Sequence, residues 1–348
     1  MSVQSVKITV HLLESLGFII NKSKSNLIPS QICTFLGFSF NSRNITLELT
    51  QDKKTSIAAF ISKIKSLKLC KIRYFSKFIG TLVSACPAVK YGRAHTKSFE
   101  RARYLALIVS RQNYDKVFKI PGEIKKDLDW WSNNILNSKN EIKQDSFSLE
   151  IYCDASSTGW GAYSQGETTS GWWSKADSSK HINYLELLAV FYSLNCFAQH
   201  LKSTKILVRV DNTTTLAYIN KMGGVRYPEL STLARLIWQW CEERDIWLLV
   251  SYVKSDKNKS DQPFRLISLE TEWELSKQAF NDIIKHFGCP EVDLFASHAN
   301  HKCLKYFSWF KDPFSLGVDA FTVCWSKLFF YAFPPFSLIT RVLKKNIN

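Results

Sequence analysis

Hydrophobic residues recur at two spacings along the chain, and the changes between them divide it into parts. Residues 5–17 carry apolar side chains three to four positions apart, which predicts an amphipathic helix. Residues 18–50 favour short strands separated by turns. From Gln51 the helical spacing returns and predicts four helices, over about 51–67, 72–89, 92–110 and 121–136. We therefore expect a strand-bearing part over 1–50 and a helical region over 51–136.

The second half of the chain follows a different pattern. The polar stretch NSKNEIKQDS, at 137–146, shows neither spacing and is predicted to be a linker. Three strands are then expected, followed by alternating helices and strands, at 149–154, 160–165, 170–174, 184–201, 205–211, 213–221, 229–244 and 246–253. This order predicts an α/β fold over 147–265, with a mixed sheet and flanking helices. Residues 266–348 are rich in aromatic residues and interrupted by prolines, which suggests a small C-terminal module.

Positive charge is concentrated in the first part of the chain. The formal net charge is +16, and residues 1–149 contain 24 Lys and Arg against 10 Asp and Glu. A soluble Lys-rich surface would explain this charge, but the aromatic residues between the basic ones favour nucleic acid as the partner. The candidate phosphate-binding residues are Lys63, Lys71, Arg73, Lys77, Arg93 and Arg101.

The cysteines and the apolar runs indicate the cellular compartment of the protein. The nine cysteines form no CxxC pair and lie mostly inside apolar runs, which suggests a reducing compartment and no structural zinc. No stretch is long and apolar enough to span a membrane, and the N-terminus lacks the pattern of a signal peptide. We therefore expect an intracellular protein of the cytoplasm or nucleus, without a membrane partner.

Four acidic residues lie where a strand ends or a helix starts. Asp154 and Asp211 each close a strand, Glu186 is expected in the first turn of a helix, and Asp261 follows the last strand. Parallel neighbouring strands that both end in Asp bring their carboxylates to one edge of the sheet. Clustered carboxylates repel unless cations neutralise them, and two Mg²⁺ ions about 4 Å apart can hydrolyse a phosphodiester.

Three of these four acids also have an ordinary structural explanation. Asp154 could cap a turn, Glu186 could be a plain acid in the first turn of a helix, and Asp211 could be the N-cap of the helix that follows. All four acids in this order, each in the expected local structure, favour the metal site.

Residues 147–265 resemble a type 1 ribonuclease H domain of the retroelement kind, through YCDASSTGWGA, HINYLELLAV, LVRVDNTTTLAYI and NKSDQPFR. The resemblance implies a ribonuclease H-like sheet on which the four acids bind two Mg²⁺ ions, with Mn²⁺ as a substitute. It also implies cleavage of the RNA strand of an RNA–DNA hybrid, with Asp154 shared by both ions. Asn183 matches a residue that contacts the minor groove of the hybrid, and Asn212 is a second substrate-binding candidate. His181 is interpreted as a turn or substrate-contact residue rather than a ligand.

Residues 12–136 resemble the end of a retroelement reverse transcriptase. The segment FLGF at 35–38 belongs to a palm-end and primer-grip-like hairpin within 1–50, and the helices of 51–136 resemble thumb and connection. The segments GTLVSACPAVKYGRAH and DLDWW are most similar to DIRS-type retrotransposons, whose elements also carry a segment like 266–348. For that segment, a module that packs on the nuclease is favoured.

Polymerase activity is not expected from this chain. The first 51 residues contain no Asp, and no Asp-Asp pair occurs anywhere, although nucleotide addition needs clustered carboxylates. We expect the catalytic palm to lie upstream of Met1, so that the upstream polymerase part or an intact element copy becomes a possible partner. The oligomeric state is left open.

Two other functions stay open at this point. One is a catalytically inactive nucleic-acid-binding remnant, because the surroundings of Asp261 depart from the family pattern and Tyr252 stands where many relatives have His. The other is an integrase-like hydrolase on the same fold, against which the helix motif around Glu186 argues.

Overall fold

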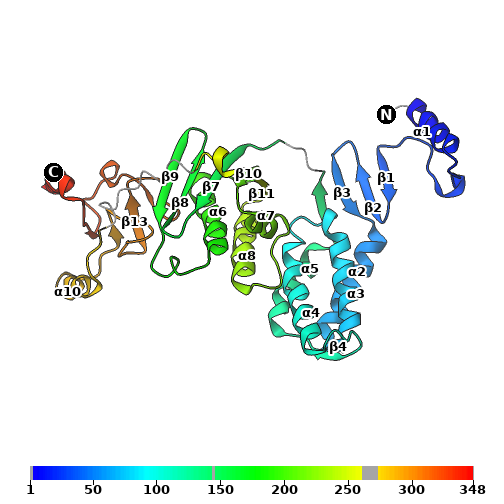
Figure 1. Cartoon of the computed structure of the whole chain (residues 1–348), viewed down its shortest axis with the longest axis horizontal. Helices are drawn as coiled ribbons and strands as arrows, with labels where there is room; N and C mark the ends of the chain where they lie inside the picture. The colour runs from blue at the N-terminus through cyan, green and yellow to red at the C-terminus, as the bar shows by residue number, and fades with distance from the viewer. Residues whose placement is uncertain (1–2, 143–145, 261–272, 348) are drawn as a thin grey trace. The chain divides into compact units, whose positions relative to one another are not determined.

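The computed structural model describes residues 3–142, 146–260 and 273–347. The chain divides into two compact units, Met1–Gln144 and Asp145–Asn348 (Figure 1). Asp261 and the rest of 261–272 lie outside the described residues. Within the described part, no helix combines the length and the apolar character needed to cross a lipid bilayer.

A four-stranded antiparallel sheet opens the first unit, in the order β1-β2-β3-β6. Its strands are β1 (Ile32–Phe35), β2 (Phe38–Asn41), β3 (Thr46–Leu49) and β6 (Lys139–Glu141). The FLGF segment forms the β1–β2 turn, where Leu36 and Gly37 both have positive φ and Phe35 pairs with Phe38. Two consecutive residues with positive φ match the twist of a two-residue hairpin. The helix α1 (Val3–Ser15) precedes this sheet and has no buried residue.

The predicted linker over 137–146 differs from what the structure shows. Residues 139–141 are the strand β6, which pairs with β3, and the Asn140 side chain donates a hydrogen bond to the Pro87 carbonyl at 2.8 Å. The sequence does not predict this strand because its residues are polar. Strand pairing at a sheet edge depends on main-chain hydrogen bonds, which do not require an apolar pattern. Most of the predicted linker therefore belongs to the first unit.

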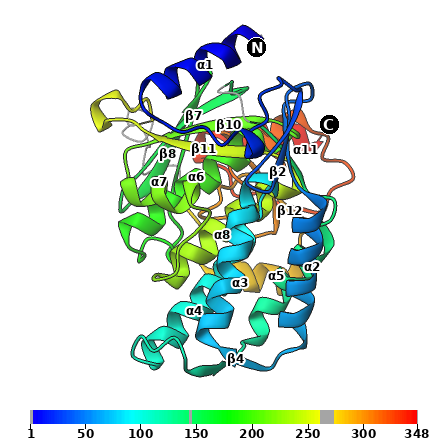
Figure 2. The same cartoon turned by 90° about the vertical axis from the view of Figure 1, so that its right-hand side faces the viewer.

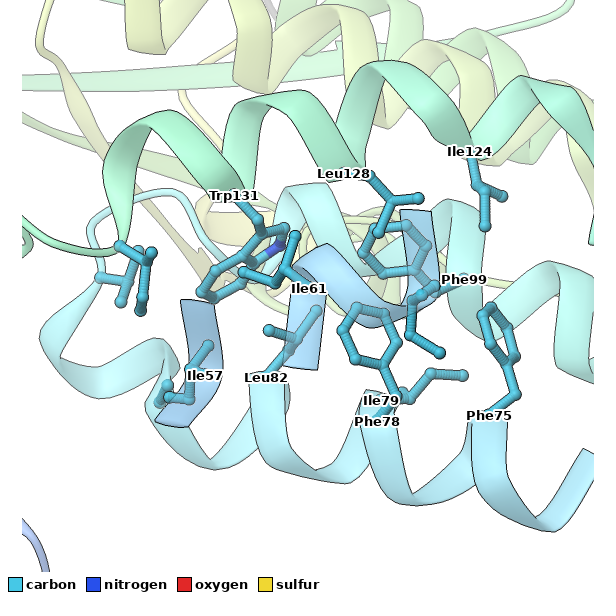
Figure 3. Packing of buried hydrophobic residues seen from close by; sticks show 14 of the residues in the cluster. Ile57, Ile61, Phe75, Phe78, Ile79, Leu82, Phe99, Ile124, Leu128 and Trp131 are labelled. Atoms are coloured by element: carbon cyan, nitrogen blue, oxygen red, sulfur yellow. The ribbon is translucent and has the colours of Figure 1, made fainter. Parts of the chain in front are cut away.

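Four helices form the core of the first unit and run alongside one another in both views (Figures 1 and 2). They are α2 (Gln51–Ser66), α3 (Ile72–Ala85), α4 (Lys97–Val109) and α5 (Lys125–Asn134). The four predicted helices are thus confirmed, with shorter ends because 3-10 turns at Cys86–Ala88, Ala94–Thr96 and Gly122–Ile124 flank them. Apolar stripes such as Ile57 and Ile61 on α2 pack against Phe78 and Trp131, which are all but inaccessible to solvent (Figure 3). A short ribbon of β4 (Leu69–Lys71) and β5 (Val117–Lys119) completes the unit.

The second unit is built on a five-stranded mixed sheet, as predicted. Its strands are β7 (Leu149–Ala155), β8 (Gly159–Ser164), β9 (Glu167–Trp172), β10 (Lys205–Val210) and β11 (Trp247–Tyr252). The order across the sheet is β9-β8-β7-β10-β11. Strand β8 is antiparallel to both β7 and β9, and β10 runs parallel to both β7 and β11.

Three helices flank this sheet: α6 (Ile182–Ala198), α7 (Thr213–Asn220) and α8 (Pro228–Glu243). Helix α6 packs on β7 and β8, and both α7 and α8 contact β11 (Figure 1). Every residue of α6 from Leu185 to Ala198 is buried. A helix that is apolar on all sides has to be covered on all sides.

The C-terminal part of the chain provides some of that cover. It holds α10 (Lys277–Phe287), β12 (Val292–Asp293), β13 (Lys305–Ser308), β14 (Gly317–Val318), β15 (Phe330–Tyr331) and α11 (Ile339–Ile347). Its strands form a small parallel sheet. Its contacts with the mixed-sheet part of the second unit include hydrogen bonds between Tyr192 and His298, from Thr169 to the Lys311 carbonyl, and from Cys196 to that same carbonyl. The C-terminal part therefore packs on α6 and β9.

The bond between Tyr192 and His298 gives a testable prediction. The Tyr192 hydroxyl lies 2.8 Å from His298 Nε2, and within the described residues the buried Nδ1 of the same ring has no partner. In Tyr192→Phe the buried imidazole loses its Nε2 partner as well, so the free energy of unfolding should fall by about 1–2 kcal/mol. Urea unfolding measures this, with the exposed Tyr227→Phe as a control expected to stay within about 0.5 kcal/mol. A Tyr192→Phe protein as stable as the control would contradict the role of this contact.

Candidate metal centre

Three of the four predicted acids come together in the second unit. Carboxylate oxygens of Asp154, Glu186 and Asp211 all lie within 4.8 Å of one another. Glu186 is buried, and the two aspartates are half-buried. The fourth acid, Asp261, lies outside the described residues.

The register of the sheet explains why the two aspartates meet. Strand β10 runs parallel to β7, with Arg209 opposite Tyr152. Asp154 comes two residues further along β7, and Asp211 comes two residues after Arg209, directly after the end of β10. The two aspartates therefore lie side by side at the ends of neighbouring strands. Because parallel strands present their carboxyl ends at one edge of a sheet, the sequence could predict this pair.

Glu186 reaches the pair from helix α6, but not from the turn that was predicted. The helix begins at Ile182, so Glu186 is its fifth residue, and the prediction of a first-turn position is wrong. The His181 side chain is the N-cap, with Nδ1 accepting a hydrogen bond from the Asn183 backbone N–H at 3.1 Å. An acid beyond the first turn gains little from the helix dipole, so the ordinary explanation for Glu186 does not hold.

Neighbouring residues take the other two ordinary roles as well. Asn212, not Asp211, is the N-cap of α7, and its Oδ1 accepts from the Thr215 N–H at 2.9 Å. Ser156, not Asp154, holds the turn after β7, because its Oγ accepts from the N–H groups of Thr158 and Gly159. Neither capping nor turn formation therefore accounts for Asp154 and Asp211.

Electrostatics make this cluster costly without a cation. Glu186 is only 5% exposed, and its Oε2 has no hydrogen-bond partner within the described residues. Burial, and then the charges of Asp154 and Asp211, raise the pKa of Glu186 to about 9. At neutral pH and without a cation this carboxyl is therefore protonated. A divalent cation bound by the three carboxylates would offset the free-energy cost of their desolvation.

The donor set indicates which ion would fit. All three groups offer carboxylate oxygens, and the cluster contains no thiolate or imidazole ligand within the described residues. Hard oxygen donors favour Mg²⁺, Mn²⁺ or Ca²⁺ over zinc or copper. The unpartnered Oε2 of Glu186 is a ready ligand atom, so the residues present fit the predicted magnesium site.

Two further residues support the cluster, and the sequence did not reveal them. Ser255 donates a hydrogen bond from Oγ to Asp211 Oδ2 at 2.5 Å, which fixes the orientation of that carboxylate. The Asn258 side chain is buried and donates to the Cys153 carbonyl at 3.1 Å, directly before Asp154. Their only signal was the polar run after β11, which is equally typical of any loop.

The predicted substrate-binding asparagines lie beside the acids. Asn212 follows Asp211 directly and donates from Nδ2 to Asn183 Oδ1 at 3.1 Å. Asn183 is the second residue of α6, three before Glu186. The two amides thus form a linked pair at the starts of α7 and α6. His181 serves as a helix cap, in line with its interpretation as a turn residue.

The six basic candidates all lie in the first unit, whereas the acids lie in the second. Lys63, Lys71 and Lys77 are exposed, whereas Arg93 and Arg101 are half-buried. Arg73 is also exposed, but it forms a two-point ion pair with Asp115 at 2.9 and 3.0 Å. Arg93 lies 3.9 Å from Glu100. The three lysines are therefore more available to contact phosphates than Arg73 and Arg93, which pair with acidic residues.

No family model matches this chain, and no curated protein matches it. Among solved structures, it is similar to the foamy viral protease-reverse transcriptase with double-stranded DNA, at 16% identity and a TM-score of 0.33; the match covers 72% of this chain and 43% of the viral one. It is also similar to LC11-RNase H1 with an RNA/DNA hybrid, at 17% identity and a TM-score of 0.28. A third similar structure is an N-terminal RNase H domain from Mycobacterium tuberculosis, fused to maltose binding protein, at 13% identity and a TM-score of 0.29. Each of these last two matches covers 34% of this chain and 92% of the other.

The chain thus spans less than half of that viral protein. The α/β fold class predicted from the sequence, a mixed sheet with flanking helices, is confirmed by the strand order and by the helices that flank the sheet. At identities and TM-scores this low, the likenesses carry no argument about activity, which has to come from the geometry of the site.

Proposed function

We propose that this chain is a metal-dependent ribonuclease that cuts the RNA strand of RNA–DNA hybrids and derives from a DIRS-type retroelement. The observation that carries the proposal is the cluster of Asp154, Glu186 and Asp211, in which a buried carboxylate oxygen has no partner within the described residues. Such a group is costly for folding, so a role in binding a cation explains its presence.

Each side chain has a distinct part in the proposed reaction. Asp154, Glu186 and Asp211 would hold Mg²⁺, and Asp261 is proposed as the further ligand of a second ion. When bound, the metal supplies an activated water and stabilises the leaving oxygen of the phosphodiester. Glu186 has to give up its proton to bind, and Ser255 keeps Asp211 turned toward the site.

Substrate recognition is assigned to the amides and to the basic surface. Asn183 and Asn212 would lie along the minor groove of the hybrid, where a 2′-hydroxyl distinguishes RNA from DNA. The lysines and arginines of the first unit would hold phosphates without regard to sequence.

A catalytically inactive binding remnant is the second candidate function. The excess of positive charge over residues 1–149 favours nucleic-acid binding whether or not the acids are active. Tyr252, at the end of β11, stands where many relatives of the resembled family have His, which weakens the case for catalysis.

Cleavage of a labelled hybrid separates the two functions. A hybrid labelled on either the RNA or the DNA strand is incubated with purified chain and Mg²⁺, Mn²⁺ or EDTA. The proposal expects metal-dependent cutting of the RNA strand alone, with 3′-hydroxyl and 5′-phosphate ends. Tight binding without cutting in either metal would establish the binding remnant, and equal cutting of both strands would contradict the substrate assignment.

Phosphate binding by the first unit can be tested through salt. Lys77 is exposed and forms no ion pair within the described residues. Lys77→Ala should reduce the slope of log affinity against log salt concentration for the hybrid by about 0.9 if it contacts one phosphate. The exposed Lys327→Ala, in the second unit, removes the same charge and is expected to leave the slope unchanged. An equal change in both variants would mean that net charge, rather than a local contact, governs binding.

A further inference from the structure

A cavity of about 330 Å³ lies in the second unit, away from the three acids. Ser170 of β9 contributes to its wall, and the rest of the lining comes from the C-terminal part. The lining includes the aromatic residues Phe295, Trp309 and Phe310, beside serines and aliphatic side chains. Trp309 and Phe310 are 51% and 60% exposed. The cavity thus opens to solvent beside two accessible rings.

Polar groups in the lining are able to form further hydrogen bonds. Within the described residues, the hydroxyls of Ser170, Ser308 and Ser337 make no side-chain hydrogen bond. The Asn300 amide donates only a long bond, of 3.5 Å, to the Trp273 carbonyl. Asp312 adds a carboxylate that already accepts from Tyr306 and from the His298 N–H. The cavity therefore offers donors, acceptors and flat apolar walls together.

The register of the sheet relates this cavity to the acid cluster. Asp154 pairs with Gly161 on β8, and Gly161 pairs with Ser170 on β9. Residues directly opposite in antiparallel strands point to the same face. Ser170 thus stands in the same row as Asp154, two strand spacings or roughly 10 Å away. A nucleic-acid strand at the acids would need only a few nucleotides to reach the cavity.

We propose that this cavity binds an unpaired base of the nucleic acid held at the acid cluster. Rings that stack on a base, together with groups that bond its edge, are the means by which proteins hold unpaired nucleotides. The volume is at the small end for ligand sites and suits one base rather than a larger group. The proposal rests on the nucleic-acid binding of the proposed function, but not on cleavage.

The charges around the cavity distinguish this mode of binding from phosphate binding. Among the described residues, the lining contains one cation, Lys311, whose ammonium forms an ion pair with Glu167. Phosphate contacts therefore contribute little here. The loss of RNA affinity caused by removing the Trp309 ring should therefore be nearly the same at low and high salt. The affinity for the hybrid, in contrast, should fall steeply as the salt concentration rises.

Binding of labelled oligonucleotides in EDTA tests the proposal without any cleavage. The probes are a ten-nucleotide RNA, an abasic strand of the same length and the hybrid. Trp309→Ala should weaken binding of the RNA about tenfold, as loss of one stacking contact does, and leave the abasic strand unaffected. Phe336→Ala removes a ring that is even more exposed, at 91%, and is not among the lining residues, so it should change nothing.

A second variant guards against a folding defect. Ser337 is exposed at the cavity rim, so Ser337→Trp would fill the cavity without removing a core contact, and it should weaken RNA binding as Trp309→Ala does. Equal RNA affinities of Trp309→Ala and Phe336→Ala would overturn the proposal, as would an equal loss for RNA and abasic strands. Failure to cut the hybrid would count only against the ribonuclease, because the readout here is binding.

Discussion

Asp154→Asn is expected to lower the rate of metal-dependent RNA cleavage at least about a thousandfold. Asp154 shares the cluster with both other acids, Glu186 and Asp211. A neutral amide is a poor ligand for Mg²⁺, and a bound ion contributes several kcal/mol to the transition state, with each 1.4 kcal/mol worth about tenfold. Single-turnover rates on the labelled hybrid in Mg²⁺ measure the change.

The matched control is Asp282→Asn on α10, where the exposed carboxylate pairs with Lys285 and lies outside the cluster. Its rate should equal that of the unmodified protein. Hybrid affinity of both variants should be nearly unchanged, since phosphate contacts come from the first unit. An Asp154→Asn protein that cuts within tenfold of the control would remove Asp154 from the proposed mechanism.

Glu186→Gln is expected to stabilise the metal-free protein by about 3 kcal/mol at pH 7, while abolishing cleavage. The pKa of Glu186 is raised from 4.5 to about 9, mainly by burial, so between these values the folded protein binds a proton that the unfolded chain has lost. The free energy of unfolding therefore falls as pH rises through this window, by up to about 1.4 kcal/mol per pH unit. A glutamine keeps the shape without this cost.

Urea unfolding in EDTA at pH 5, 7 and 8.5 measures this dependence. The free energy of unfolding of the unmodified protein should fall as the pH rises. That of Glu186→Gln should fall less, so that the difference between the two proteins grows with pH. Glu243→Gln, at an exposed carboxylate on α8, should follow the unmodified protein. If the Glu186→Gln protein loses stability with pH as steeply as the unmodified one, Glu186 does not carry the buried proton.

The mixed sheet could be predicted because its strands show a clear alternation. Leu149, Ile151 and Cys153 are buried, and the residues between them are half-buried. The start of α6 was predicted two residues late because its cap, His181, is not among the usual capping residues. The strand β6 was missed because a polar edge strand has no apolar period.

Long-range packing explains what else the sequence did not reveal. In the sequence, Asp127 of α5 looks like an ordinary acid in the first turn of a helix, yet its side chain is fully buried. Its carboxylate accepts a hydrogen bond from the Ser98 hydroxyl, and its Oδ1 lies 2.9 Å from His95 Nδ1. In the site, the acids were predictable from residue type and strand ends. Ser255 and Asn258 were not, because they contact Asp211 and Cys153 from 44 and 105 positions away.

The central claim is that Asp154, Glu186 and Asp211 bind a divalent cation, and a calorimetric titration with Mn²⁺ tests it most directly. The titration is run at pH 7 in two buffers of different ionisation enthalpy, on the unmodified protein, Asp154→Asn and Asp282→Asn. We predict saturable binding with release of about one proton, because Glu186 must ionise to bind. Binding should be lost in Asp154→Asn and kept in Asp282→Asn. Equal binding by all three proteins, or no binding by any, would contradict the claim.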